Sequence, residues 1–201
     1  MIIKIFTGPL NYDISQLYSK DVDEYIIGVD QGCSQLLEQS INIDMAIGDF
    51  DSINKDIYLD IKSKAKQTIV HDNIKSNTDT YLALEHALAM EHTEIIIYGG
   101  LGKRFDHSYA NVKLLEKGKI KIINNESMIY VLHPGNYSID NKYKYISFFS
   151  LNEVDDLSLV NFKYELQSIN LKTNNPLCIS NEGSGIVTFS KGSLLVIHQN
   201  E

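Results

Sequence analysis

Cysteine is scarce in this sequence, and its scarcity excludes two kinds of site. Only Cys33 and Cys178 occur among the 201 residues, far apart and in no C-x-x-C pair. Two distant thiols give neither a disulfide framework nor a thiolate metal site, and they suit a reducing compartment. We therefore expect a soluble, cytoplasmic protein.

Basic side chains are outnumbered as well. The chain has 18 Lys and Arg against 26 Asp and Glu, so its formal net charge is -8 at pH 7. This balance disfavours a general binder of nucleic acid, whose affinity comes from contacts with phosphates. An acidic protein can still bind a nucleotide when a metal ion carries part of the charge.

Long apolar runs are missing too. The first ten residues, "MIIKIFTGPL", are interrupted by Lys4 and Pro9, and they are interpreted as a first strand. No segment approaches the roughly 18 apolar residues of a membrane span, so we predict no membrane contact. The length of the chain suits one large domain or two small ones.

Short β-branched runs alternate with helix-like stretches as far as about residue 132. The clearest helical segments are "TDTYLALEHALAM" (78–90) and "DHSYANVKLLEKG" (106–118). Near-continuous apolar strands separated by helices are typical of a mostly parallel sheet that is covered on both faces. The predicted strands are 2–6, 25–29, 45–48, 67–70, 94–99 and 119–123.

Unusual polar residues follow four of these strands, in the loops "GVDQG", "GDFDS", "KSNTD" and "GGLGKRFDH". In a parallel sheet the carboxyl ends of the strands share one edge, and ligands bind in the crevice there. The four loops should therefore lie side by side. They predict a site that contains Asp30, Asp49, Asp51, Asp79, Arg104 and Asp106.

The pattern changes after "HPGN" (133–136), where we place a hinge. Beyond it, short segments punctuated by Asn, Gly and Ser indicate antiparallel strands and no helix. We predict an α/β domain with a mostly parallel sheet flanked by helices (1–132), followed by a small antiparallel β-sandwich domain (133–201). We expect so small a second domain to be stabilised by packing against the first domain or against another chain.

Two interpretations of "GDFDSI" (48–53) stay open on the residues alone. Asp51 or Ser52 caps a helix that begins near Asn54, or the paired carboxylates hold a cation that neutralises them. Asp79 likewise suits either the first turn of a helix or the same cation site. An all-oxygen ligand set favours Mg²⁺ over zinc, with substrate phosphates completing its shell.

The glycine-rich segment "GGLGKR" (99–104) does not have the spacing of a known nucleotide motif. It lacks the first glycine and the Ser/Thr of a Walker loop, and neither G-x-G-x-x-G nor G-x-S-x-G occurs in the chain. It is either a simple strand-to-helix turn or a backbone that approaches phosphates, with Arg104 as a charged donor. The residues alone thus indicate transfer of a phosphoryl or pyrophosphoryl group and leave the substrate open.

In order along the chain, "GDFDSI", "TDTYLAL", "GGLGKRFDHSYANV", "ISNE" and "GSLLVI" resemble the thiamin pyrophosphokinase family. This resemblance implies an α/β nucleotide domain followed by a β-sandwich. It also implies a homodimer with active sites between subunits, which makes thiamine diphosphate and AMP from thiamine and Mg²⁺-ATP. The alternatives are a magnesium-dependent kinase of another small alcohol and a non-catalytic nucleotide sensor.

The resemblance further implies a role for each matching residue. Catalysis and Mg²⁺ binding fall to Asp49, Asp51 and Asp79. ATP binding falls to Asp30, Gly32, Thr78, Gly100, Arg104, Asp106 and His107. Thiamine binding falls to Asp106, Ser180 and Asn181.

The chain departs from the family pattern at a few positions. Ser76 stands where bacterial members often have an acid, Gln31 replaces a glycine, and Gly183 stands where an aromatic is common. The sequence has no tryptophan, so any aromatic lid over thiamine must be Phe or Tyr, with Phe149 and Phe189 among the possibilities.

Overall fold

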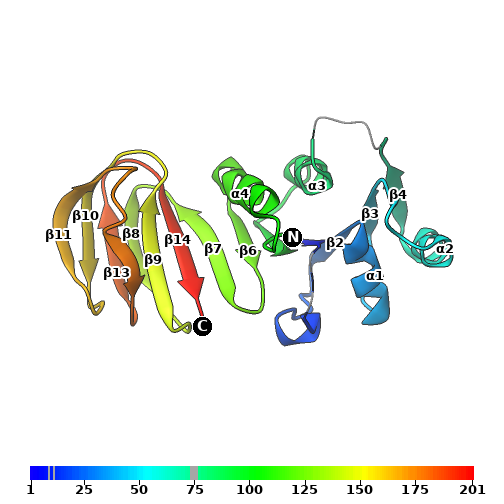
Figure 1. Cartoon of the computed structure of the whole chain (residues 1–201), viewed down its shortest axis with the longest axis horizontal. Helices are drawn as coiled ribbons and strands as arrows, with labels where there is room; N and C mark the ends of the chain where they lie inside the picture. The colour runs from blue at the N-terminus through cyan, green and yellow to red at the C-terminus, as the bar shows by residue number, and fades with distance from the viewer. Residues whose placement is uncertain (9, 11, 73–76) are drawn as a thin grey trace. The chain divides into compact units, whose positions relative to one another are not determined.

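The computed structural model describes residues 1–8, 10, 12–72 and 77–201, which form two compact units, Met1–Asn125 and Glu126–Glu201 (Figure 1). The division therefore falls after Asn125, earlier than the predicted hinge at 133–136. The reason is that residues 127–132 form a strand that pairs with the last strand of the chain.

The first unit contains a six-stranded parallel sheet in the order β6-β5-β1-β2-β3-β4. Every strand predicted for this part is present, within one residue at either end. The chain reverses its direction of travel across the sheet between β1 and β5, which makes these strand ends the switch point where ligands bind. The strands are β1 (Ile2–Thr7), β2 (Glu24–Val29), β3 (Met45–Gly48), β4 (Gln67–Val70), β5 (Glu94–Gly99) and β6 (Ile120–Ile123).

Four helices cover this sheet: α1 (Gln31–Glu38), α2 (Lys55–Lys64), α3 (Asp79–Leu88) and α4 (Phe105–Leu114). Both predicted helices are present as α3 and α4, and a 3-10 turn, η2 (Leu115–Lys117), extends α4. Helices α1 and α2 share a core cluster with the strands, while α3 and α4 lie across the sheet from them (Figure 1). Within the described ranges, no helix is long and apolar enough to cross a membrane.

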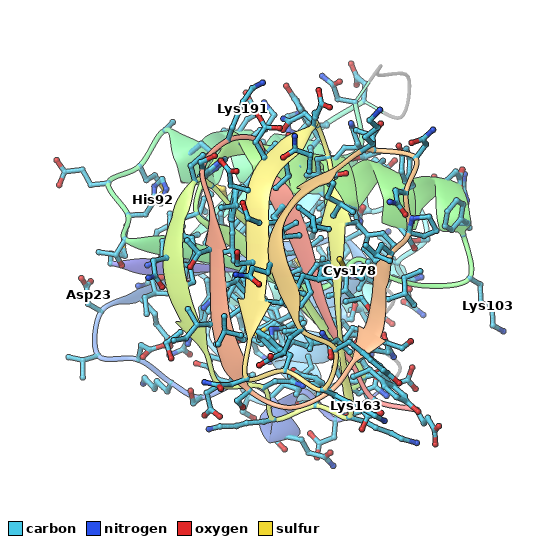
Figure 2. The ribbon with its side chains drawn as sticks, turned by 90° about the vertical axis from the view of Figure 1, so that its left-hand side faces the viewer. Asp23, His92, Lys103, Lys163, Cys178 and Lys191 are labelled. Atoms are coloured by element: carbon cyan, nitrogen blue, oxygen red, sulfur yellow. The ribbon has the colours of Figure 1, made fainter. Side chains whose placement is uncertain are left out.

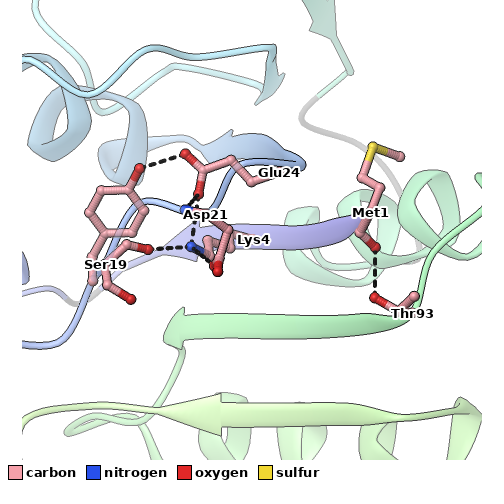
Figure 3. A network of polar contacts seen from close by, with 7 residues as sticks. Met1, Lys4, Ser19, Asp21, Glu24 and Thr93 are labelled. Carbon is pink, nitrogen blue, oxygen red and sulfur yellow. Dashed lines mark hydrogen bonds and ion pairs between the residues drawn. The ribbon is translucent and has the colours of Figure 1, made fainter.

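Lys4, in the middle of β1, is buried, while the side chains of its two partners are 9% (Glu24) and 41% (Asp21) exposed (Figure 3). Its ammonium lies 2.7 Å from a carboxylate oxygen of Asp21 and 2.8 Å from one of Glu24, and it donates to the carbonyl of Ser19. Burial alone would raise the pKa of Glu24, but hydrogen bonds from Lys4, Asp21 and Tyr18 bring it below its usual value. The network fixes the segment around the 3-10 turn η1 (Ile14–Gln16) to the sheet.

The second unit consists of two antiparallel sheets, β12-β9-β14-β7 and β11-β10-β13-β8. A single cluster that includes Phe148, Leu157, Val187 and Val196 fills its core, so the predicted fold class is confirmed. Its strands are β7 (Ser127–Leu132), β8 (Gly135–Ile139), β9 (Tyr145–Ser150), β10 (Val154–Val160), β11 (Leu166–Leu171), β12 (Cys178–Asn181), β13 (Gly185–Phe189) and β14 (Leu194–Gln199).

His198 of β14 is a buried titratable group of this unit. Its Nδ1 lies 2.7 Å from Oδ1 of Asn141, and its Nε2 lies 3.0 Å from the hydroxyl of Tyr130. Because the Asn141 oxygen only accepts, Nδ1 carries the proton and Nε2 accepts from the hydroxyl. Burial lowers the pKa of His198 to about 4, so this ring is neutral at physiological pH.

Candidate active site

A pocket of about 830 Å³ lies at the switch point of the first unit and is lined by residues of that unit alone. This volume falls within the range of small-molecule sites. Residues from all four predicted loops line it, and those of "KSNTD", Thr78 and Asp79, stand at the start of α3. The predicted residues that line it are Asp30, Asp49, Asp51, Thr78, Asp79, Gly100, Arg104 and His107.

Phe50 explains how two aspartates of one turn come to face the same pocket. Its side chain is buried and packs against Tyr58 of α2, with 5.3 Å between the ring centroids. Its backbone has a φ of 56°, a left-handed conformation that bulky residues rarely adopt. Asp49 and Asp51 on either side of it both line the pocket. The predicted helix cap is corrected, because Asn54 and not Asp51 or Ser52 caps α2.

Asp30 connects the loop after β2 to the turn after β3. One of its carboxylate oxygens accepts the backbone N–H of Phe50 at 3.3 Å. The same oxygen would lie 1.8 Å from a Cβ atom at position 48, so only glycine fits beside it. Asp30 has a φ of 46°, and two neighbouring turns of the site thus contain a non-glycine residue in the left-handed region.

The start of α3 contributes Thr78 and Asp79. The Thr78 hydroxyl accepts the N–H of Tyr81 as a helix cap, and Asp79 occupies the first turn, where the helix dipole favours an acid. One residue later, the buried Thr80 hydroxyl lies 2.8 Å from that of Thr7 at the end of β1. This contact joins the helix to the central strand beside the pocket.

The glycine-rich loop after β5 is held by α4. The Asn111 amide donates to the Gly100 carbonyl at 2.8 Å, and the Ser108 hydroxyl accepts the Gly102 N–H at 3.0 Å. Gly100 has a φ of 74°, and a Cβ there would lie 3.0 Å from the Asn111 amide nitrogen. The loop thus depends on glycine both for its conformation and for the close approach of α4.

Arg104 and Asp106 form an exposed, two-pronged ion pair, with Nη2 at 2.6 Å and Nε at 3.3 Å from the carboxylate. The hydrogen bond from Arg104 lowers the pKa of the Asp106 carboxyl. Exposed pairs of this kind contribute little stability, so Arg104 can exchange Asp106 for another anion at small cost.

Some predicted residues lie elsewhere, and some pocket residues were not predicted. Gly32 packs against β1, where a Cβ would lie 2.1 Å from the Phe6 carbonyl oxygen, and neither Gly32 nor Asp106 lines the pocket. Ser76 lies outside the described residues.

The unpredicted lining residues include Thr7, Tyr12, Lys103, Asn111, Asn124 and Asn125. Thr7 and Asn124 sit at strand ends, so the rule that identified the aspartates also applies to them.

The donor set of this pocket suits a hard cation. Its acidic lining residues are four aspartates, and neither cysteine lines it. Among the described residues, no three His, Cys, Asp or Glu side chains are gathered as a ready metal cluster. Mg²⁺ fits such a site, because it commonly binds one or two carboxylates and completes its shell with water and substrate phosphates.

Of the three residues predicted for thiamine, Asp106 lies on α4 of the first unit, and Ser180 and Asn181 lie on β12 of the second. Ser180 is exposed, has a φ of 54°, and donates its N–H to the Ser147 hydroxyl at 2.9 Å. Asn181 is 2% exposed and lines a separate cavity of about 200 Å³ in this unit. Its amide oxygen and nitrogen bond to the backbone N–H and carbonyl of Tyr164, at 2.9 and 2.8 Å.

Comparison with known proteins gives a consistent result. A family model described as "Thiamin pyrophosphokinase, catalytic domain" matches residues 17–125, and one described as "Thiamin pyrophosphokinase, vitamin B1 binding domain" matches residues 136–196. A curated relative, thiamine pyrophosphokinase of Bacillus subtilis (strain 168), is 38% identical over 186 residues, which cover 87% of each protein.

Solved structures agree with this. The crystal structure of thiamine pyrophosphokinase from Bacillus subtilis matches with a TM-score of 0.91 and 34% identity, covering 100% of both chains. That of thiamin pyrophosphokinase from Geobacillus thermodenitrificans matches with a TM-score of 0.88 and 31% identity, covering 100% of this chain and 98% of the other.

Proposed function

Because the chain belongs to the thiamin pyrophosphokinase family, we propose that it transfers the pyrophosphoryl group of Mg²⁺-ATP to the hydroxyl of thiamine, giving thiamine diphosphate and AMP. The observation that carries this proposal is the pocket of about 830 Å³ at the switch point, which is lined by four aspartates and by Lys103 and Arg104 of the glycine-rich loop. Such a pocket suits a polyphosphate that arrives with a cation.

Catalysis of this transfer requires positioning and neutralisation of charge more than covalent chemistry by the protein. Arg104 would leave Asp106 for a phosphate oxygen, and Gly100 would let the backbone approach the phosphates. Asp30, Thr78 and His107 would complete the ATP side, with Gly32 allowing α1 to pack closely behind it. Asp106, released by Arg104, would then face thiamine.

The predicted cation belongs to the same site. Asp49, Asp51 and Asp79 would hold Mg²⁺, which when bound supplies positive charge against the triphosphate. The buried side chain of Phe50 supports this assignment, because it anchors the turn that carries Asp49 and Asp51. A loop whose carboxylates were only solvated would not require such an anchor.

We place the thiamine side of the site at the end of β12, with Ser180 and Asn181, and we propose a homodimer whose active sites lie between subunits. Exposed apolar side chains of the second unit, Val160, Leu177, Ile179 and Ile186, support an association of this kind. The two free, buried thiols are compatible with the cytoplasm.

The homodimer can be tested by mixing inactive subunits. Asp49→Asn chains combined with chains carrying both Ser180→Ala and Asn181→Ala should regain part of the activity, because a hybrid dimer contains one intact composite site. A fully active species with a mass of about 23 kDa, that of the single chain, would contradict the dimer.

The reaction itself is tested by analysing the products of one incubation. Thiamine and Mg²⁺-ATP should give thiamine diphosphate and AMP in equal amounts, separated by chromatography. A kinase that transfers the γ-phosphoryl group would release ADP and thiamine monophosphate, and a nucleotide sensor would bind without turnover. Either result would overturn the proposal. The family match does not favour these two alternatives.

A further inference from the structure

Tyr164 is an exposed aromatic residue whose backbone is held in place. Among the Phe and Tyr residues of Glu126–Glu201, all of which are described, it is the single one with more than a third of its surface exposed, at 57%. The Asn181 amide binds both its N–H and its carbonyl, as described above. One buried side chain therefore holds the backbone that carries this ring.

The turn that carries Tyr164 is also bonded to Glu182, the residue that follows β12. Lys163 donates its backbone N–H to the Glu182 carbonyl at 3.0 Å, and its ammonium lies 2.6 Å from the Glu182 carboxylate. The turn is also closed on itself, because Glu165 accepts the N–H of Asn161 at 2.7 Å. These hydrogen bonds hold the turn in one conformation although the Tyr164 ring is exposed, which indicates that the position of the ring serves a function.

Tyr164 forms part of the wall of the cavity of about 200 Å³, with apolar neighbours that include Leu159, Leu166 and Cys178. In Figure 2, Cys178 lies midway along the strands of this unit, and Lys163 lies at one end of them. The cavity is smaller than the roughly 300–1,000 Å³ of complete small-molecule sites, so it suits one ring of a larger ligand. A flat ring against Tyr164 would gain stacking and apolar contact together.

We propose that Tyr164 is the aromatic wall on which the pyrimidine ring of thiamine stacks, and that Asn181 is a positioning residue that acts through Tyr164. This inference rests on the function proposed above. The pyrimidine is favoured over the cationic thiazolium, because the Lys163 ammonium already lies 5.5 Å from the centre of the Tyr164 ring. Phe189 is buried and lines neither pocket, so it is not a comparable platform.

The first test uses steady-state kinetics of the full-length enzyme. Tyr164→Ala should raise KM for thiamine about tenfold or more, the usual effect of losing one stacked ring, and leave KM for ATP unchanged. Tyr164→Phe should retain the wild-type KM, because the ring and not the hydroxyl makes the contact. Tyr145→Ala is the matched control in the same unit. An unchanged KM for thiamine in Tyr164→Ala, with normal wild-type turnover, would overturn the inference and leave the proposed function standing.

A double-mutant cycle separates the two roles. If Asn181 acts through Tyr164, then Asn181→Ala raises KM for thiamine, and adding it to Tyr164→Ala has no further effect. If the two substitutions instead multiplied each other's effect on KM for thiamine, Asn181 would contact thiamine directly, which would contradict the inference.

A third variant provides a signal that is independent of activity. Tyr164→Trp introduces the single tryptophan of the chain, and its fluorescence should change when thiamine is added without ATP. The aminopyrimidine fragment of thiamine should produce the same change and the hydroxyethylthiazole fragment should not. A response to the thiazole fragment alone, or none to thiamine while the variant still turns it over, would overturn the assignment.

Discussion

The two units of this chain differ in the polar groups that they bury or direct toward a cavity. In the first, aspartates from neighbouring loops line one large pocket, and buried Lys4 lies within 2.8 Å of two carboxylates. In the second, buried His198 is neutral, and the Asn181 amide holds a turn beside a small apolar cavity. The first unit therefore offers charged groups to a ligand, whereas the second offers an apolar cavity beside a fixed turn. The experiments below test that contrast.

The largest effect should come from removing charge from the large pocket. Asp49→Asn or Asp51→Asn should lower kcat by about a hundredfold or more, because each takes away a charge that offsets the cation. The melting temperature should change little, since both side chains face the pocket. Asp56→Asn, at an exposed position in the first turn of α2, is the control. Near-normal turnover of both pocket variants with Mg²⁺-ATP would show that the turn holds no metal.

Breaking the buried ion network should have the next largest effect, on stability. Lys4→Met leaves the Asp21 and Glu24 carboxylates without their cation, and we expect a loss of about 3–5 kcal/mol in the free energy of unfolding. Lys64→Met removes the exposed pair with Asp60 and should cost less than about 1 kcal/mol. Denaturant unfolding measures both. If Lys4→Met and Lys64→Met lowered the free energy of unfolding equally, the burial of Lys4 would not matter for the strength of its ion pairs.

The second unit should be the more sensitive to mild acid. Between pH 6.5 and about 4 the unfolded chain protonates His198 and the folded chain does not, so the free energy of unfolding falls as the pH is lowered. The loss across that window should approach roughly 3 kcal/mol. His198→Gln should flatten the curve of stability against pH, whereas exposed His133→Gln should not. The same slope in wild type and His198→Gln would refute the assignment.

The smallest contrast concerns the thiols. Burial raises the pKa of Cys33 to about 12 and that of Cys178 to about 11, so both are un-ionised and unreactive near neutral pH. Native protein should react with a thiol reagent only slowly, and Cys178 should react before Cys33. Mass spectrometry of the labelled protein identifies the order. Rapid labelling of Cys33 in folded protein would contradict this account.

The sequence predicted the first unit well because its strands are continuous β-branched runs and their ends are marked by aspartates. It did not predict α1, because "DQGCSQLLE" begins with loop-forming residues and its contact with β1 depends on the absence of a side chain at Gly32. The strand Ser127–Leu132 was missed because it follows β6 closely and its partner, β14, lies at the far end of the chain.

The site was predictable in composition and less so in geometry. Strand ends identified the aspartates, but the left-handed backbone of Phe50 has no signal in sequence, since bulky residues rarely adopt it. The amide of Asn181 reaches a residue seventeen positions away, a contact that only the folded second unit creates.

The buried ring of Phe50 has a consequence for how this enzyme should respond to heat. Because packing against Tyr58 holds a strained backbone in place, the direction of Asp49 and Asp51 depends on the firmness of that packing. Local loosening of α2 needs less free energy than unfolding of the whole unit. Activity should therefore decline at temperatures where the fold as a whole is still intact, and the decline should be reversible on cooling.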